Sequence, residues 1–389
     1  MKIGYKMCEI EEKIIEIMED NGIDVVATLP CDKAKSLFYL IPQHFHDVAL
    51  NKEEDGIGIC AGAYLAGGKP AIVMQSSGLG NSMNALMSLT RTYELPLPII
   101  TSWRGVYKEK IPAQIPFNKN LPRMLKAFDI PYTIIDDNSK INLMDNVICD
   151  AYENNRIHVT LISPKTWGNK QGGEEAELTE RFPKRERKTI LEYKKTIHEP
   201  EMTRYDAIKT IAEYLDEEAV VSNIGIPSKE LYDIKDRDLN FYMLGSYSQA
   251  SSIGLGMALK TKRETVVLDG DGSLLATSVL PTIAAESPKN LSIFCLDNGT
   301  LGSTGDQLTN AYSGVDMELM AIISGIKETK KVHTEKELRS TIEDLYDNKG
   351  PRFIHVIVKP GNVPSVANIK LTPEQIKRRF MGAMPLTLR

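Results

Sequence analysis

Two short motifs in the second half of the chain contain residue types that can hold a metal ion and a phosphate group. Gly270-Asp271-Gly272-Ser273 follows an apolar run, and Asp297-Asn298-Gly299-Thr300 follows the next one. The glycines let the backbone approach a ligand closely, and amide groups that enter a helix can face an anion. Carboxylate, amide and carbonyl oxygens are the hard ligands that magnesium prefers. Together the motifs predict a magnesium site that also binds phosphate.

The spacing of the two motifs supports this interpretation, although each motif alone has a simpler one. Asp-Gly and Asn-Gly are common turn dipeptides, so Gly270-Asp271-Gly272 by itself favours an ordinary turn. Between Gly272 and Asn298 there are 25 residues, which is about the length of one helix and one strand. Ligands of open parallel sheets bind at the carboxyl ends of strands. We therefore expect Asp271 and Asn298 on neighbouring strand ends.

Apolar runs alternate with helical patterns along the chain, which predicts an α/β fold of two doubly wound, parallel-sheet domains and no central third domain. The expected strands of the first half are residues 24–29, 47–50, 71–75, 97–102, 132–135 and 158–163, and its expected helices are 9–19, 53–66, 81–90, 121–128 and 140–153. The expected strands of the second half are residues 219–222, 240–244, 265–268, 291–296 and 352–358, with helices at 204–215 and 251–260.

A polar, charged stretch without strand pattern separates these two units. We interpret it as a linker at residues 166–200, between a first domain at 1–165 and a second domain at 201–389. The two units share no obvious sequence repeat, so any kinship between them would be structural only.

Composition restricts the classes of partner. The chain has 389 residues, 42% hydrophobic and 25% charged, with a net charge of -5. This mild, interspersed charge argues against nucleic acid as a partner and leaves small anionic substrates open. No apolar run reaches the length that spans a bilayer, and the first residues have no apolar signal core. Five scattered cysteines favour reduced thiols, so we expect a cytoplasmic protein that does not associate with membranes.

The sequence GDGS followed by LDNGTLGSTG resembles the diphosphate-binding signature of thiamine-diphosphate enzymes. The resemblance implies that the second domain binds diphosphate, and that Asp271, Asn298 and a main-chain oxygen of Thr300 hold magnesium. It also implies that the turn containing Gly245 and Ser246 touches the diphosphate. The residues expected to bind the cofactor are Gly245, Ser246, Tyr247, Gly270, Asp271, Gly272, Ser273 and Asn298.

This chain departs from the family at the residue that supports the bent cofactor. The family usually places a bulky apolar residue there, in a motif like GSMG, whereas this chain has Gly245-Ser246-Tyr247-Ser248. Tyrosine is large enough for this position, but its hydroxyl needs a hydrogen-bond partner if it is buried. Gln249 likewise stands where relatives often carry another residue type.

The same resemblance implies that the first domain binds the aminopyrimidine ring and carries a glutamate that activates the cofactor. Glu53 has the matching offset at the start of a small-residue helix, and Glu54 is one residue away from it. An activating group is needed because the proton at thiazolium C2 is too weakly acidic to leave unaided at neutral pH. The simpler interpretation is that Glu53, Glu54 and Asp55 are acids favoured at a helix N-terminus.

Residues 74–86 and 102–105 resemble the subgroup that decarboxylates 3-sulfopyruvate and 3-phosphonopyruvate, and residues 107–114 are similar to its sulfopyruvate branch. That branch is often two separate subunits, and this chain resembles their fusion. The resemblance implies an enzyme, a carboxy-lyase that converts 3-sulfopyruvate to sulfoacetaldehyde and carbon dioxide without oxidation, in coenzyme M biosynthesis. The alternatives are phosphonopyruvate, another decarboxylation or carboligation of a 2-oxo acid, or a non-catalytic binding module that kept the fold.

Arg104 is the candidate for binding the anionic end of a small 2-oxo acid. It follows an expected strand, and a guanidinium fork suits a sulfonate or phosphonate better than a point charge does. The alternative is a structural arginine that caps carbonyl groups or pairs with Glu94. Gln75, Ser76 and Ser77 end another expected strand and can supply neutral hydrogen-bond donors.

The assembly follows from the need to join the two half-sites. In the family these halves meet between subunits, so we expect a homodimer or a larger homo-oligomer with sites between the subunits. The basic stretch at residues 372–380 can be a docking helix, but a solvated helix is the simpler expectation.

Overall fold

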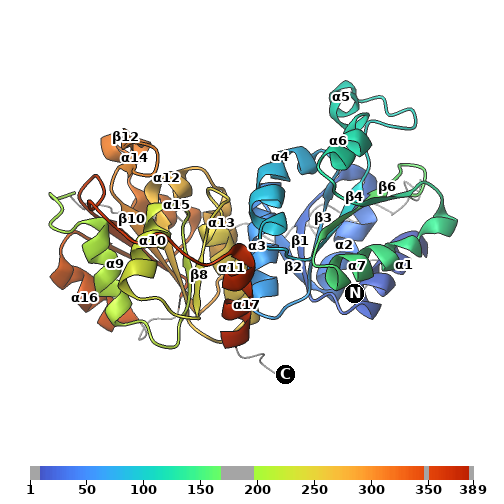
Figure 1. The fold of residues 1–389 in the computed structure, drawn as a ribbon. Helices are drawn as coiled ribbons and strands as arrows, with labels where there is room; N and C mark the ends of the chain where they lie inside the picture. The colour runs from blue at the N-terminus through green and yellow to red at the C-terminus, as the bar shows by residue number, and fades with distance from the viewer. Residues whose placement is uncertain (1–8, 168–196, 346–349, 385–389) are drawn as a thin grey trace, which may run out of the picture.

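The computed structural model describes residues 9–167, 197–345 and 350–384, which form two α/β lobes side by side (Figure 1). The expected linker at 166–200 lies outside the described residues except at its two ends. Within the described ranges, no helix is long and apolar enough to cross a membrane.

The first domain contains a six-stranded sheet in the order β2-β1-β3-β4-β6-β5, and every pairing in it is parallel. Its strands are β1 (Val25–Leu29), β2 (His46–Ala49), β3 (Pro70–Gln75), β4 (Leu97–Ser102), β5 (Tyr132–Ile135) and β6 (Ile157–Ile162). The central strands β1, β3 and β4 are buried almost throughout, as expected for a parallel sheet with both faces covered.

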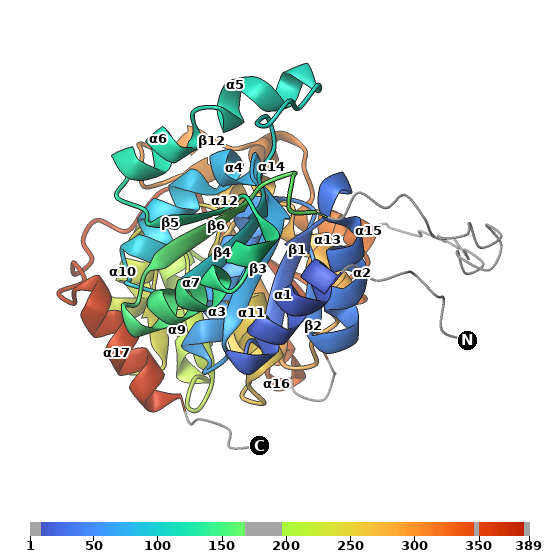
Figure 2. The same cartoon turned by 90° about the vertical axis from the view of Figure 1, so that its right-hand side faces the viewer.

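Helices cover both faces of this sheet. They are α1 (Glu9–Asp20), α2 (Lys35–His44), α3 (Glu53–Leu65), α4 (Gly78–Ala85), α5 (Ile115–Asn118), α6 (Leu121–Ala127) and α7 (Leu143–Glu153). Helices α1, α2 and α7 cover the outer face, which Figure 2 shows toward the viewer. The inner face packs on α3 and belongs to a core that continues into the second domain. Helix α4 runs into a π-helical segment, η2 (Leu86–Arg91).

The second domain repeats the topology of the first. Its sheet has the order β13-β14-β10-β9-β7-β8, which becomes 2-1-3-4-6-5 when the six strands are numbered along the chain, as in the first domain. The strands are β7 (Ala219–Ser222), β8 (Asn240–Tyr242), β9 (Thr265–Gly270), β10 (Leu291–Asp297), β13 (Glu328–Val332) and β14 (Arg352–Ile357). The short strands β11 (Thr300–Leu301) and β12 (Gln307–Leu308) pair separately. The two halves, which share no obvious sequence repeat, therefore share a topology.

The helices of the second domain are α9 (Arg204–Glu213), α10 (Ile226–Ile234), α11 (Ala250–Lys260), α12 (Asp271–Leu275), α13 (Val279–Glu286), α14 (Asn310–Ser313), α15 (Met317–Ser324), α16 (Glu335–Glu343) and α17 (Pro373–Ala383). Three of them begin with a capping box, in which a threonine side chain and the side chain three residues later satisfy each other's backbone amides.

The fold class of two parallel-sheet α/β domains is confirmed, and the strands that were expected lie within two residues of the observed ends. Strand β13 was missed because it lies at the sheet edge and reads Glu-Thr-Lys-Lys-Val, with polar side chains on its exposed face. Helix α2 was missed because it is short and contains Pro42.

The expectation of a solvated helix at residues 372–380 was wrong. Ile376 and Phe380 of α17 are fully buried, and the Phe380 ring packs against Phe241 of β8. On the other side, Lys377 Nζ donates a hydrogen bond to the carbonyl of Glu94 in the first domain. Helix α17 therefore docks across both domains, at the base of their interface in Figure 1.

The two domains meet at the crossing of α3 and α11, which are equivalent helices because each follows the second strand of its sheet. Neither helix has a polar face, since nearly all residues of both are buried. A Cβ atom on Gly62 would lie 1.9 Å from the carbonyl oxygen of Ile253, and one on Gly256 would lie 1.9 Å from that of Ile59. Only glycine allows the two backbones to touch in this way.

The crossing predicts a large cost for a single methyl group. Gly62→Ala should lower the free energy of unfolding by about 1–3 kcal/mol, because the added Cβ atom must push the two helices apart. Urea denaturation of the full chain measures this change.

Gly382→Ala is the matched control, since Gly382 also lies in a helix but its added Cβ atom meets no described residue within 4 Å. Its free energy of unfolding should stay within about 1 kcal/mol of the parent. Equal effects of the two substitutions would show that the crossing is not a tight contact.

Candidate active site

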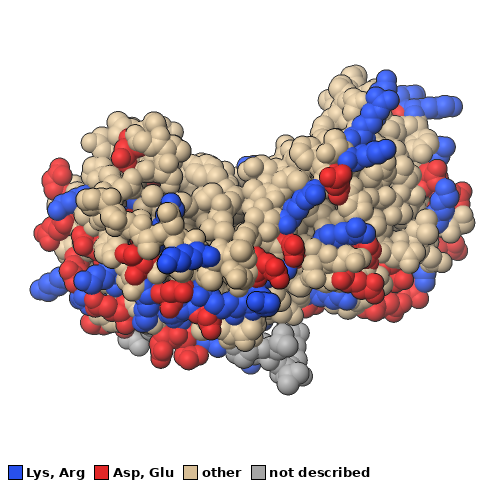
Figure 3. All heavy atoms as spheres, viewed as in Figure 1, with Lys and Arg blue, Asp and Glu red and all other residues tan. Residues whose placement is uncertain are grey.

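The carboxyl ends of both sheets open on the same side of the molecule, above the crossing of α3 and α11. The segments that follow β3 and β4 and those that follow β9 and β10 rise on either side of this crossing (Figure 1). Figure 3 shows the surface hollowed between the two lobes there. Because ligands of parallel sheets bind at this edge, the hollow is the candidate active site, and we refer to it as the cleft.

The structure brings the two motifs of the second domain together. Asp271 is the first residue of α12, directly after β9, and Asn298 directly follows β10. These strands are neighbours, with Leu296 in register with Gly270. The predicted proximity of the two strand ends is thus confirmed.

The surroundings of Asp271 and Asn298 suit a cation bound to a phosphate group. Burial of Asp271 and the negative charge of Asp297 raise the pKa of Asp271 to about 7, against a hydrogen bond from Thr309 Oγ1. Asn298 is also buried, and its Nδ2 atom has no hydrogen-bond partner within the described part of the chain. A divalent cation would favour the ionised form of Asp271, and a phosphate oxygen would accept from Asn298 Nδ2.

A buried aspartate–histidine pair shapes the loop that contains Asn298. Asp297 Oδ1 accepts a hydrogen bond from the amide of Gly299, at 3.0 Å, and Asp297 Oδ2 lies 2.7 Å from His355 Nε2. His355 belongs to β14 and is fully buried. Burial opposes a charge on His355, but its hydrogen bonds to Asp297 and Asp316 together raise its pKa. The sequence analysis did not identify His355. Its only sign in the sequence is that it is the one polar residue in the apolar run at residues 353–358.

The turn at residues 244–248 lies against the motif that contains Asp271. Ser246 and Ser248 have φ values of 69° and 72°, in the left-handed region that side chains rarely adopt. The hydroxyl of Ser246 is buried and has no partner among the residues described. The Tyr247 side chain is exposed, so the condition under which its hydroxyl needs a partner is not met, but the hydroxyl still donates a hydrogen bond to the carbonyl of Gly272.

Tyr93 anchors this turn from the other domain. Its hydroxyl accepts a hydrogen bond from the amide of Leu244, at 2.8 Å, and donates one to the carbonyl of Tyr242, at 2.7 Å. Its ring packs against Phe241, with 4.9 Å between the ring centroids, and is fully buried. Sequence reasoning missed this residue, because the partners of Tyr93 lie about 150 positions away along the chain.

The three adjacent acids at the start of α3 have different surroundings. Glu53 lies against Gly78 of α4, where an added Cβ atom would come within 2.7 Å of Glu53 Cγ, and its Oε2 atom accepts from Asn81 Nδ2. Glu54 forms an ion pair with Lys52 at 2.6 Å. Asp55 is buried and accepts hydrogen bonds from Thr277 and Ser278 of the second domain. Of the three, Glu53 is the one beside the carboxyl end of β3.

Arg104 is almost completely buried at the end of β4. Its Nε atom donates to Glu109 Oε2 at 2.8 Å, and its Nη1 atom donates to Asp32 and to Gln75 Oε1. Burial opposes the charge, but the hydrogen bond to Glu109 and the nearby Asp32 raise the pKa of Arg104 above its ordinary value. The structure thus pairs Arg104 with two carboxylates that the sequence did not point to, and neither is Glu94.

The neutral donors expected beside Arg104 divide into two groups. Gln75 bridges Arg104 and Ser77, since its Oε1 atom accepts from the guanidinium and its Nε2 atom donates to Ser77 Oγ. Both side chains are partly exposed. Ser76 is fully buried, where it donates to Asn118 Oδ1 and accepts from the amide of Arg104. Its hydroxyl is therefore committed to holding the loop that contains Arg104.

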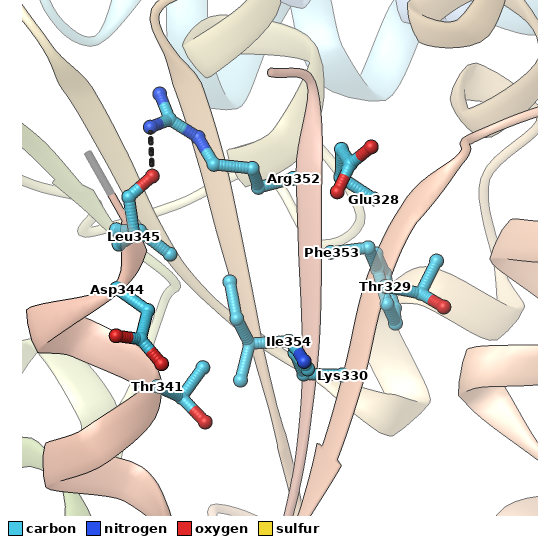
Figure 4. A pocket seen from close by; sticks show the side chains of 9 residues that line it. All are labelled: Glu328, Thr329, Lys330, Thr341, Asp344, Leu345, Arg352, Phe353 and Ile354. Atoms are coloured by element: carbon cyan, nitrogen blue, oxygen red, sulfur yellow. Dashed lines mark hydrogen bonds between the residues drawn. The ribbon is translucent and has the colours of Figure 1, made fainter. Parts of the chain in front are cut away.

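A separate small pocket lies at the opposite edge of the second sheet. Figure 4 shows it between β13, β14 and the end of α16, where Arg352 Nη1 donates to the carbonyl of Leu345. Glu328 and Arg352, which line it, are the first residues of their strands. The pocket therefore opens at the amino edge of the sheet, away from Asp271 and Asn298.

The fold and the cleft define a thiamine pyrophosphate enzyme. Residues 9–127 match the family model described as thiamine pyrophosphate enzyme, N-terminal TPP binding domain, and residues 229–356 match the model of its C-terminal TPP binding domain. Thiamine pyrophosphate is the same compound as thiamine diphosphate. The chain belongs to this family, within the group that contains sulfopyruvate and phosphonopyruvate decarboxylases.

Three relatives illustrate the group. The chain is 47% identical to a sulfopyruvate decarboxylase of Methanosarcina acetivorans, over 95% of this chain and 96% of the relative. It is 33% identical to a phosphonopyruvate decarboxylase of Streptomyces viridochromogenes, over 92% and 91% of the two chains. It is 42% identical to the sulfopyruvate decarboxylase subunit beta of Methanococcus maripaludis, over 47% of this chain and 98% of that subunit. The last match agrees with the expected resemblance to a fusion of two subunits.

The contacts of Tyr93 predict that its hydroxyl supports the turn at residues 244–248. Tyr93→Phe should lower the free energy of unfolding by about 1–3 kcal/mol, because the amide of Leu244 loses its buried partner. It should also raise the concentration of thiamine diphosphate needed for half-saturation. Urea denaturation and cofactor titration measure the two effects.

Tyr64→Phe is the control, because the Tyr64 hydroxyl bonds to Asn155 at an exposed position. This variant should unfold and bind the cofactor like the parent. A Tyr93→Phe variant that is equally unaffected would contradict the anchoring role.

Proposed function

We propose that the chain catalyses the non-oxidative decarboxylation of 3-sulfopyruvate to sulfoacetaldehyde and carbon dioxide, with thiamine diphosphate and Mg²⁺. The resemblance of residues 107–114 to the sulfopyruvate branch implies that this reaction belongs to coenzyme M biosynthesis. The observation that carries the proposal is the shared location of the candidate groups: Asp271 and Asn298 end neighbouring strands of one sheet, and Glu53 and Arg104 lie at the same edge of the other.

The residues of the cleft fit the cofactor. Asp271, Asn298 and the main-chain oxygen of Thr300 would hold Mg²⁺, as their buried, oxygen-rich surroundings suit a hard cation. Gly245, Ser246, Gly270, Gly272 and Ser273 would contact the diphosphate, and Tyr247 would support the bent cofactor, as the family resemblance implies. When bound, the cofactor supplies a place for the electron pair that carbon dioxide leaves behind.

Glu53 and Arg104 have distinct parts in this proposal. Glu53 would share a proton with the ring nitrogen of the bound cofactor. This role requires an ionisable carboxyl group at position 53. Arg104 binds the sulfonate of the substrate, and Gln75 and Ser77 orient the remaining oxygens. The largely buried position of Arg104 keeps water from the charged group, so its electrostatic attraction to an anion is stronger than it would be in bulk solvent.

The test of the proposal measures carbon dioxide release from 3-sulfopyruvate and 3-phosphonopyruvate side by side. We expect the parent chain to prefer the sulfonate, and Glu53→Gln to reduce turnover by at least about 100-fold because it removes the proton-transfer group. Calorimetry should show that Glu53→Gln still binds thiamine diphosphate in the presence of Mg²⁺.

Glu54→Gln is the matched control, because Glu54 is paired with Lys52. This substitution should leave turnover near the parental rate. Near-normal turnover in Glu53→Gln would remove its assigned role. Preference for 3-phosphonopyruvate would show that the proposed substrate is wrong. Formation of a carboligation product would show that the proposed reaction is wrong. Absence of Mg²⁺-dependent cofactor binding in the parent would favour a non-catalytic binding module.

We also propose that the chain works as a homodimer or larger homo-oligomer with sites shared between copies. The resemblance supports sharing, whereas the structure packs α3 on α11 within one chain. Both arrangements can use the same pair of helices, α3 and α11, and they differ in whether one chain or two chains supply the pair. Which chain contributes each helix is therefore a question for a mixing experiment.

Mixing two inactive variants distinguishes the arrangements. In a dimer that contains one Glu53→Gln chain and one Asp271→Asn chain, shared sites would leave one site intact and one doubly altered. Co-refolded variants in equal amounts should then regain about a quarter of the parental activity, since half of the dimers are mixed. Either variant alone, treated identically, is the control. No recovery would show that each site is completed within one chain.

A further inference from the structure

The two carboxylates that hold Arg104 differ sharply in how firmly they are fixed. Glu109 is enclosed, with 7% of its side chain exposed, and it also accepts hydrogen bonds from the amides of Lys110 and Ile111. Asp32 has 52% of its side chain exposed, and its other hydrogen bond is a weak one from Cys31 Sγ at 3.7 Å. Asp32 can therefore turn into solvent at little cost, while Glu109 cannot.

One nitrogen of the Arg104 guanidinium has no hydrogen-bond partner among the described residues. Glu109 binds its Nε atom and Asp32 binds its Nη1 atom, so each carboxylate contacts a single nitrogen. The Nη2 atom is buried and has no partner in the described ranges. A buried polar group without a partner costs about 1–3 kcal/mol. The outer edge of the fork, formed by Nη1 and Nη2, thus lacks one acceptor.

The charge balance also points to an exchange. Arg104 and the nearby Lys33 balance the charges of Asp32 and Glu109, so a sulfonate that enters while Asp32 stays in place would add one uncompensated negative charge. Lys33 follows Asp32 and lies close enough to Glu109 to lower the pKa of that carboxyl further. Figure 3 shows Lys and Arg side chains on the upper part of the first domain, to one side of the hollow, and such charges attract anions. If Asp32 turns into solvent, where its charge is screened, the balance around the bound sulfonate is restored.

We propose that Asp32 is an exchangeable internal counterion of Arg104, which the sulfonate of the substrate displaces. This inference rests on the proposed function. The sulfonate oxygens take both Nη1 and Nη2, while Glu109 stays on Nε and keeps the guanidinium plane in place. A 2-oxo acid without a distal anion cannot displace Asp32, so the ion pair acts as a specificity filter.

The exchange takes place next to the candidate catalytic residue. Gln75 links Arg104 to Ser77, and Gly78, the next residue, touches Glu53. Arg104 and Glu53 thus lie beside the two ends of one short segment, Gln75 to Gly78. The anionic end and the reacting end of a three-carbon acid can be held by the same short segment.

The test compares Asp32→Asn with the parent, both loaded with thiamine diphosphate and Mg²⁺. The probe is 3-sulfopropanoate, an unreactive analogue of the substrate, and its affinity is measured by calorimetry. Asp32→Asn removes the competing charge at constant size, so the probe should bind roughly three- to tenfold more tightly, equivalent to about 0.7–1.4 kcal/mol. Propanoate, which has a carboxylate but no sulfonate, should gain less than about twofold in affinity.

Asp137→Asn is the control for a general change in charge. Asp137 follows β5 at the same sheet edge but bonds to Ser139, so its loss should change the affinity less than about twofold. Asp32→Ser provides a second, smaller replacement and should also tighten binding.

The outcomes separate the inference from the function on which it rests. If the parent neither binds 3-sulfopropanoate nor decarboxylates 3-sulfopyruvate, the proposed function fails. If the parent does both, and the two Asp32 variants bind the probe no better or more weakly, the exchange is wrong. If Asp137→Asn increases the affinity for the probe as much as Asp32→Asn does, the increase comes from the change in net charge. That result would also contradict the proposed exchange.

Discussion

The structure depends on the backbone contact between α3 and α11. Gly62 and Gly256 remove the side chains at the crossing, so that each helix meets a carbonyl of the other at a distance that excludes a Cβ atom. Because these helices occupy equivalent positions in two domains of the same topology, their crossing turns both carboxyl edges to one side. Glu53 begins one helix and the turn at residues 244–248 precedes the other. The relative position of the two half-sites therefore follows from a contact that contains no catalytic group.

Buried charged groups are compensated differently on the two sides of the cleft. In the second domain, Asp271 is desolvated and lies near Asp297, so its pKa rises and a cation would relieve the repulsion. In the first domain, Arg104 already has two carboxylates, and its Nη2 atom has no acceptor among the residues that the structure describes. The first arrangement favours a resident metal ion. The second favours an anion that comes and goes, because one of its carboxylates is held loosely.

Several positions show why some features were predictable and others were not. The central strands and the motif at Asp271 and Asn298 were predictable because buried parallel strands are continuous apolar runs, and because the spacing of a helix and a strand is local. Arg104 was predictable as a residue at a strand end, but its partner Asp32 was not, since the two lie 72 positions apart. The docking of α17 was also hidden, because a helix with one apolar stripe and many charges resembles a solvated one.

The sequence by itself determined the class of fold, the residues that end the ligand-binding strands and the resemblance to thiamine-diphosphate enzymes. These features depend on local periodicity and on short motifs, which one segment of chain can encode. Only the tertiary structure decided which groups surround them: Tyr93 against the turn at residues 244–248, His355 behind Asn298, and Asp32 and Glu109 around Arg104. Hydrogen bonds and ion pairs form between groups that folding brings within about 3 Å. The packing of sheets and helices determines which groups become partners. The spacing of residues along the chain does not predict these pairs.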